Sequence, residues 1–148
     1  GVLEAVLDTN LLARGLIGAP TSTAGFIAES WHAKRFRAVI SEHILGELLA
    51  AFAKPYFAHQ LRRPAIDRYL MDLRTEARLV EITAAVAGIA THAADDLVLA
   101  TALSARAPYV VTEDRGLLSV GSHEGTAVIN SGQFCAILRA VPDRGEAD

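Results

Sequence analysis

The chain has 148 residues, of which 51% are hydrophobic, a length and composition that suit one compact domain with a sizeable core. Its 14 basic and 17 acidic side chains give a net charge of −3, which argues against a protein that coats nucleic acid through a global positive field. An enzyme that gathers carboxylates around a cation stays compatible with this balance, because net charge averages over separate patches.

Strand-like and helix-like patterns alternate along the chain. In chain order, the apolar runs and helical periodicities predict a strand at 2–7, a helix at 23–35, a strand at 37–41, helices at 41–54 and 64–77, a strand at 77–83, a helix at 95–107, strands at 109–112 and 126–130, and a helix at 132–140. Strands that are apolar on both faces are typical of a sheet covered on both sides. We therefore expect an α/β three-layer domain over residues 1–140, with a central, mostly parallel sheet of four to five strands flanked by helices. Residues 141–148 form a polar tail.

The remaining composition predicts a cytoplasmic protein. The one cysteine, Cys135, lies in an apolar segment, so we expect a buried free thiol and no intramolecular disulfide. The chain shows no signal-type leader and no uncharged apolar run of about 18 residues, so no membrane segment is expected.

Carboxylates follow two of the predicted strands. Asp8 comes directly after the first strand, and Asp114 comes two residues after the strand at 109–112. Each is followed by the expected start of a helix. Ligands of layered α/β domains bind outside the carboxyl ends of the strands, so these acids are candidates for a site. Taken singly, each is explained equally well as a helix cap.

Two further acids lie on helices with largely apolar surfaces. Glu47 flanks the apolar stripe of the helix at 41–54, and Asp95 shares a face with Leu99 and Ala102. The adjacent Asp96 points about 100° away from Asp95. Alone, Glu47 is more often a solvated residue and Asp96 a cap, so only the combination of acids is informative.

Four converging carboxylates require a counter-charge, because like charges at close range favour protonation. Mg²⁺ or Mn²⁺ would supply it, since both prefer oxygen ligands. Such a site activates water and stabilises charge on a phosphodiester. The sequence thus predicts hydrolysis of a nucleic-acid backbone, with one or two ions bound by Asp8, Glu47, Asp95 and Asp114.

These residues resemble those of PIN-domain ribonucleases, in particular the PIN toxins of toxin–antitoxin pairs such as the virulence-associated protein C group. The resemblance rests on the segments "VLDTNLL", "ISEHILGELLAAFAK", "HAADDLVLATAL", "APYVVTEDRGLL" and "TAVINSGQFCAIL". It implies a PIN-like fold, Mg²⁺- or Mn²⁺-dependent cleavage of RNA, and inhibition by a small antitoxin protein. A homodimer or higher oligomer is also expected, with apolar residues near Trp31 or Phe57 as candidates for a dimer or antitoxin groove, although such residues are usually core.

The resemblance also implies roles for individual residues. Asp8, Glu47, Asp95 and Asp114 correspond to the four catalytic, metal-binding acids, with Asp96 as an alternative to Asp95. Thr9 and Asn10 would brace the metal site by hydrogen bonds, and Thr112 would hold the loop that presents Asp114. Glu113 stands where a small residue is common, and it either adds charge near the site or faces solvent.

Substrate contacts are predicted from position alone. Arg14 and Arg115 lie near the strand-end acids and are candidates for phosphate contacts, although solvated surface explains each of them equally well. The arginines between Arg62 and Arg78 are interleaved with acids, which favours a salt-bridged exposed face over an RNA track. Among the histidines, only His92 is expected near the site.

Two other functions stay open. A phosphatase of the haloacid dehalogenase type also carries an Asp after its first strand, but it needs a second Asp two residues later, where this chain has Asn10. A non-catalytic RNA-binding or assembly module with the same fold would be expected to lack one of the acids, and none is missing.

Overall fold

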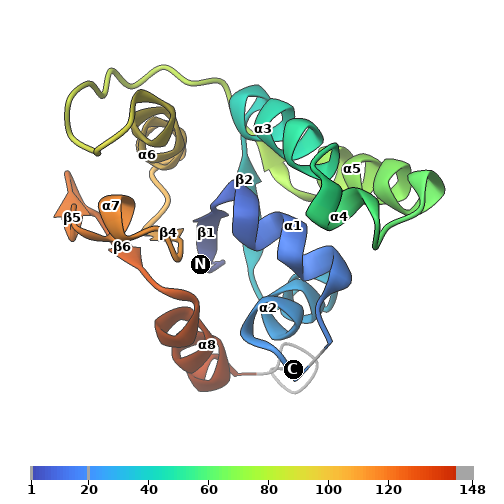
Figure 1. Ribbon diagram of the computed structural model, residues 1–148. Coiled ribbons are helices and arrows are strands. Elements are labelled where there is room, and N and C mark those ends of the chain that lie inside the picture. The colour runs from blue at the N-terminus through green and yellow to red at the C-terminus, as the bar shows by residue number, and fades with distance from the viewer. Residues whose placement is uncertain (1, 20, 143–148) are drawn as a thin grey trace.

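The computed structural model describes residues 2–19 and 21–142. These residues form a six-stranded sheet with helices packed against it (Figure 1). Its strands are β1 (Glu4–Leu7), β2 (Arg37–Ile40), β3 (Arg78–Leu79), β4 (Tyr109–Val111), β5 (Ser122–His123) and β6 (Thr126–Ile129). Their spatial order is β3-β2-β1-β4-β6-β5, and every neighbouring pair is parallel except β5 and β6. The mostly parallel sheet is as predicted, with one strand more than the expected four to five.

The additional strand is β5, a two-residue edge strand. It pairs with β6 across Glu124 and Gly125, whose φ angles of 46° and 89° form a tight left-handed turn. Ser122 and His123 carry no apolar alternation, so periodicity could not indicate this strand.

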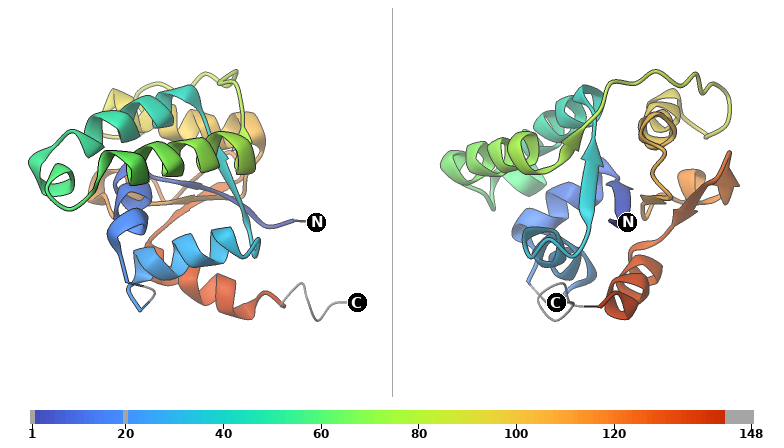
Figure 2. Two further views of the ribbon diagram at one scale, coloured as in Figure 1. Left: turned by 90° about the vertical axis from the view of Figure 1, so that its right-hand side faces the viewer. Right: turned by 180° about the vertical axis from the view of Figure 1, so that it is seen from behind.

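Helices cover the sheet on both sides. They are α1 (Thr9–Ile17), α2 (Thr23–His32), α3 (Glu42–Phe52), α4 (Pro55–Ala58), α5 (Arg63–Glu76), α6 (Ala93–Ala105), α7 (Arg115–Leu118) and α8 (Ser131–Ala140). Figures 1 and 2 show α6 on one side of the sheet and α2 with α8 on the other. Helices α1 and α7 begin directly after the two strand-end acids, which places both acids at strand-to-helix junctions.

The core lies between the sheet and these helices. Val6 and Val110 of the two central strands are fully buried, as are Leu99 of α6 and Phe134 of α8. Trp31 and Phe57 are only 5% exposed, so both belong to the core and neither offers an apolar docking surface. The Cys135 thiol is buried and free, as expected, and its burial raises its pKa.

Helix α8 ends at Ala140, and the polar tail was predicted to begin at the next residue. Residues 143–148 of that tail lie outside the described residues. None of the helices that the structure describes is both long and apolar enough to cross a bilayer.

Candidate active site

The two strand-end acids lie side by side because β1 and β4 are neighbours in the sheet. Leu7 is in register with Val111, and the backbone N–H of Asp8 donates to the Val111 carbonyl over 2.9 Å. From β1 the sheet extends toward β2 in one direction and toward β4 in the other, so this is the point at which an open α/β sheet leaves a crevice. Asp8 and Asp114 stand at its edge.

Thr112 ties the two acids together. Its side chain is fully buried, and its hydroxyl donates to Asp8 Oδ2 over 2.7 Å while accepting from the backbone N–H of Asp114 at 3.0 Å. Asp8 Oδ1 also accepts from the N–H of Thr9, and Asp114 Oδ1 accepts from that of Leu117. Both carboxylates are thereby oriented, and each still has free lone pairs, because a carboxylate accepts about four hydrogen bonds.

Glu47 joins the site from α3. The Thr9 hydroxyl donates to Glu47 Oε1 over 3.1 Å, and His43 Nε2 lies 3.2 Å from the same oxygen. His43 Nε2 also lies 3.1 Å from the carbonyl oxygen of Ala94, which directly precedes Asp95. His43 was not predicted near the site, although it precedes Glu47 by four residues and so shares its helix face.

Asp95 is the acid whose pKa is affected by the other three carboxylates. Partial burial raises its pKa, and the negative charges of Asp8, Asp114 and Glu47 raise it further, whereas His92 opposes the shift. His92 therefore lies near the site, as the sequence predicts. All four predicted acids share one electrostatic environment, although they come from two strand ends and two helices.

Asp96 has a different surrounding. Its carboxylate accepts the backbone N–H groups of Gly88, Ile89 and Ala90 at 2.7–3.2 Å. These hydrogen bonds, that of Ala90 above all, lower the pKa of Asp96 despite its burial. Asp96 thus fastens the segment before α6, and Asp95 remains the acid of this pair that meets the others.

Glu113, which follows β4, and Asn10, in the first turn of α1, have different surroundings. Glu113 Oε1 accepts from both the backbone N–H and the hydroxyl of Ser131, which ties the β4–α7 junction to the start of α8. Asn10 is exposed, and within the described part of the chain its side chain makes no hydrogen bond. The bracing role that the resemblance implies for Asn10 therefore stays a prediction.

The acids line two adjoining hollows. One, of about 250 Å³, is lined by Asp8, Thr9, Asn10, Glu47, Ala50, Ala51, Lys54, Asp95 and Asp114. The other, of about 190 Å³, is lined by Asp8, Asn10, Leu11, Arg14, Glu113 and Asp114. Arg14 thus lines a hollow together with two of the acids, whereas Arg115 lines neither hollow. A phosphate contact by either arginine stays a prediction. Lys54 was not predicted near the site. It follows Glu47 by seven residues and therefore lies on the same side of the α3–α4 segment.

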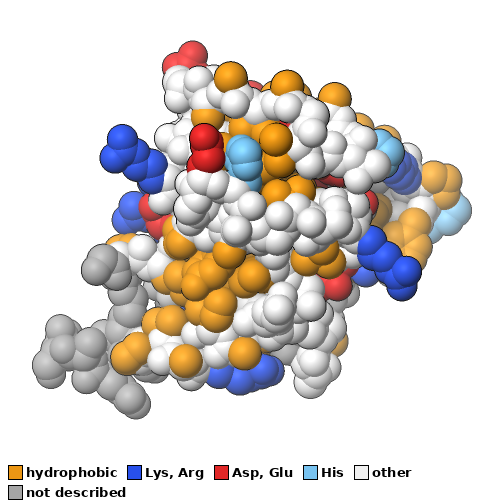
Figure 3. All heavy atoms as spheres, turned by 90° about the vertical axis from the view of Figure 1, so that its left-hand side faces the viewer, with side chains coloured by type: hydrophobic (Ala, Val, Ile, Leu, Met, Phe, Trp, Pro, Cys, Tyr) orange, Lys and Arg blue, Asp and Glu red, His pale blue; other side chains and the backbone are white. Residues whose placement is uncertain are grey.

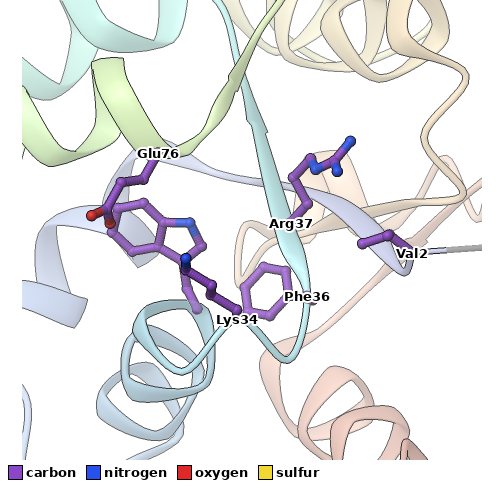
Figure 4. Close-up of a pocket in the computed structure, with 6 residues that line it drawn as sticks. Val2, Lys34, Phe36, Arg37 and Glu76 are labelled. Carbon is purple, nitrogen blue, oxygen red and sulfur yellow. The ribbon is translucent and has the colours of Figure 1, made fainter. Parts of the chain in front are cut away.

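A separate hollow lies near the amino-terminal ends of β1 and β2 (Figure 4). Its volume is about 230 Å³, and it is lined by Val2, Trp31, Lys34, Phe36, Arg37 and Glu76. It contains a single carboxylate against two cationic side chains, so it does not suit a divalent cation. The cleft at the carboxyl ends of β1 and β4 is the candidate active site.

Comparison with known families agrees with this arrangement. The PIN domain family matches residues 4–116, a stretch that includes all four acids. The chain belongs to the PIN domain family. PIN domains are generally nucleases that use divalent metal ions.

Solved structures support the PIN fold. The crystal structure of PAE2754 from Pyrobaculum aerophilum is similar with a TM-score of 0.65 at 19% identity, over 93% of this chain and 90% of that one. VapBC2 from Rickettsia felis, bound to a DNA fragment from its promoter, gives a TM-score of 0.57 at 15% identity, and FitAcB from Neisseria gonorrhoeae gives 0.53 at 19%. Each of these two similarities covers 86% of this chain and 98% of the other. No curated protein sequence matches the chain.

The donor set of this PIN domain fits a hard divalent cation. All four candidate ligands are carboxylates, which Mg²⁺ and Mn²⁺ prefer. Burial raises the pKa of Asp95 most, and the neighbouring carboxylates add negative charge that a cation would neutralise. Within residues 2–19 and 21–142, no three His, Cys, Asp or Glu side chains lie close enough, as they stand, to hold a metal ion.

Thr112→Val is expected to lower the rate of substrate cleavage about 10- to 100-fold, the usual cost of losing a group that orients a metal ligand. Valine keeps the β-branched shape in the buried position but removes the hydroxyl between Asp8 and the Asp114 backbone. The measurement is the Mn²⁺ dependence of cleavage, which should shift to higher concentration. Thr75→Val is the control, because the Thr75 hydroxyl caps only carbonyls of its own helix. An unchanged Mn²⁺ dependence in Thr112→Val would show that Asp8 needs no support from this hydroxyl.

Proposed function

We propose that this PIN domain is an endoribonuclease that hydrolyses RNA phosphodiester bonds with the help of Mg²⁺ or Mn²⁺. The observation that carries the proposal is that Asp8, Glu47, Asp95 and Asp114 line one hollow. Burial raises the pKa of Asp95 there, and the charges of the other three acids raise it further. A purely structural cluster of acids would leave this repulsion uncompensated, whereas a cation-dependent enzyme makes use of it.

The chain's own side chains have separable roles in this proposal. Asp8, Glu47, Asp95 and Asp114 would hold one or two cations, which supply positive charge to activate water and to stabilise the phosphodiester as it is displaced. Thr112 orients Asp8, and Thr9 orients Glu47, through the hydrogen bonds described above. Preorganised ligands of this kind reduce the rearrangement that catalysis would otherwise require.

The test is incubation of the chain with a mixed pool of single-stranded and structured RNAs, with Mg²⁺, with Mn²⁺ and with chelator. We expect internal cleavage of RNA with either cation and none with chelator. Single-stranded DNA and a phosphate monoester serve as comparison substrates. Release of inorganic phosphate from the monoester without chain cleavage would favour the phosphatase alternative, and RNA binding without cleavage would favour the non-catalytic module.

The resemblance to PIN toxins extends the proposal to a toxin held inactive by a small antitoxin protein in the cytoplasm, acting as a homodimer or higher oligomer. Support comes from the similarity in fold to VapBC2 and FitAcB. Growth arrest on expression of the chain, relieved when the acid site is disabled, is the expected result. Growth that is unaffected by an RNA-cleaving chain would count against the toxin role alone.

A further inference from the structure

We propose that RNA crosses the site as a single strand, from the hollow that contains Lys54 to the hollow that contains Arg14, with the scissile phosphate over Asp8 and Asp114. Lys54 and Arg14 would bind the phosphates on either side of the cut. This inference rests on the proposed ribonuclease function and adds the path of the substrate to it.

The two hollows adjoin, and we refer to them together as the groove. They share Asp8, Asn10 and Asp114, and each adds one cationic side chain, Lys54 on one side and Arg14 on the other. An RNA strand that runs from one hollow to the other over the acids therefore passes a positive side chain on each side of them. The acids alone would repel the RNA phosphates. A positively charged side chain on each side of the acids favours the approach of the strand.

The charged groups of Lys54 and Arg14 are both available to bind a ligand. Within the described residues, neither Lys54 nor Arg14 forms an ion pair with an acidic side chain, and both side chains are exposed. The arginines of the predicted salt-bridged face differ from them. On α5, Arg63 pairs with Asp67, Arg68 with Asp72 and Arg74 with Glu42, and in β3 Arg78 pairs with Glu4.

The backbone fixes the positions of Lys54 and Arg14. Lys54 stands at the junction of α3 and α4, where its N–H donates to the carbonyl of Ala51, and Arg14 lies in the last turn of α1. Helices α1 and α3 pack against each other beside β1 (Figure 1). Lys54 and Arg14 are therefore held by elements that pack against each other beside the acids.

The recessed acids favour a single strand over a duplex. Asp8 and Asp95 are both half-buried in hollows of about 190 and 250 Å³, which are open at the surface. An unpaired strand can bend its backbone toward such a recess and turn its bases outward, whereas a paired strand is held in A-form geometry by its partner. Paired RNA is therefore expected to be a poor substrate.

The test compares Lys54→Ala and Arg14→Ala with Arg63→Ala, a control that removes an exposed arginine of α5 that lines neither hollow. With single-stranded RNA, each of the first two variants should lose about tenfold in kcat/KM, the cost of one charge-assisted phosphate contact, while Arg63→Ala matches the wild type. The slope of log kcat/KM against log salt concentration should fall by about 0.7 for each lost contact. Equal thermal unfolding of all three variants excludes a folding defect.

A neutral methylphosphonate at single positions identifies the contacts. Placed one nucleotide to either side of the cut, it should slow the wild type, and at one of the two positions it should cost Lys54→Ala nothing further. Arg14→Ala should be insensitive at the opposite position. Additive losses at both positions, or a Lys54→Ala that matches Arg63→Ala, would overturn this path while leaving the ribonuclease intact. If the wild type cleaves no RNA with Mg²⁺ or with Mn²⁺, the proposed function fails, and the proposed RNA path fails with it.

Discussion

Asp8→Asn is expected to reduce metal-dependent RNA cleavage by roughly 1,000-fold or more, because it removes one charge from the cation site and with it several kcal/mol of transition-state stabilisation. The fold should survive. Asparagine can accept from the Thr9 N–H through its oxygen, and its NH₂ group can donate to the Thr112 hydroxyl, which accepts as readily as it donates. Charge is removed while shape and local hydrogen bonding are kept.

The matched control for Asp8→Asn is Asp67→Asn, the same chemical change on the exposed face of α5, where among the described residues Asp67 pairs only with Arg63. That control should retain full activity, since an exposed i,i+4 ion pair contributes at most about 0.5 kcal/mol to stability. Cleavage of RNA by Asp8→Asn at more than about a tenth of the wild-type rate would remove Asp8 from the cation site. Both proteins should show the wild-type circular dichroism spectrum.

The strand-end acids could be predicted because their positions follow from local sequence. A buried strand shows as an apolar run, and a parallel sheet brings the carboxyl ends of its strands to one edge, so Asp8 and Asp114 needed no knowledge of distant contacts. The sheet itself was predicted for the same reason. The two residues of β5 were not, because turn geometry at Glu124 and Gly125, rather than apolar patterning, creates that strand.

The choice between Asp95 and Asp96 shows the limit of local reasoning. Helix phase favoured Asp95, but the role of Asp96 depends on how residues 88–90 wrap around the start of α6, which no periodicity encodes. Likewise, the contact of His43 with the carbonyl of Ala94 joins α3 to α6 across 51 residues of sequence. Spacing could have found His43 and Lys54 as neighbours of Glu47 on their helical segment, but it could not have shown which of them lines the cleft.

Asp95→Asn is expected to have opposite effects on stability and on function. The pKa of Asp95 is raised in the folded protein, so above about pH 4, where an unfolded Asp ionises, the folded state binds more protons than the unfolded state. Stability without metal therefore falls as pH rises through the pKa of Asp95, and the full penalty persists at neutral pH. The favourable field at the start of α6 does not offset it, because the net shift is upward.

Removing that charge should raise the melting temperature of the metal-free protein at pH 7 and leave it unchanged at pH 3, where Asp95 is protonated in the wild type. Added Mn²⁺ should stabilise the wild type, since ligands that bind the folded state raise its stability, and should stabilise Asp95→Asn far less. RNA cleavage should be lost. A lower melting temperature at pH 7 would mean that Asp95 is a structural acid of the first turn of α6, whereas equal stabilisation of both proteins by Mn²⁺ would place the cation elsewhere in the cleft. The competing demands of folding and cation binding therefore meet at this one carboxylate, and the two pH arms of the experiment separate them.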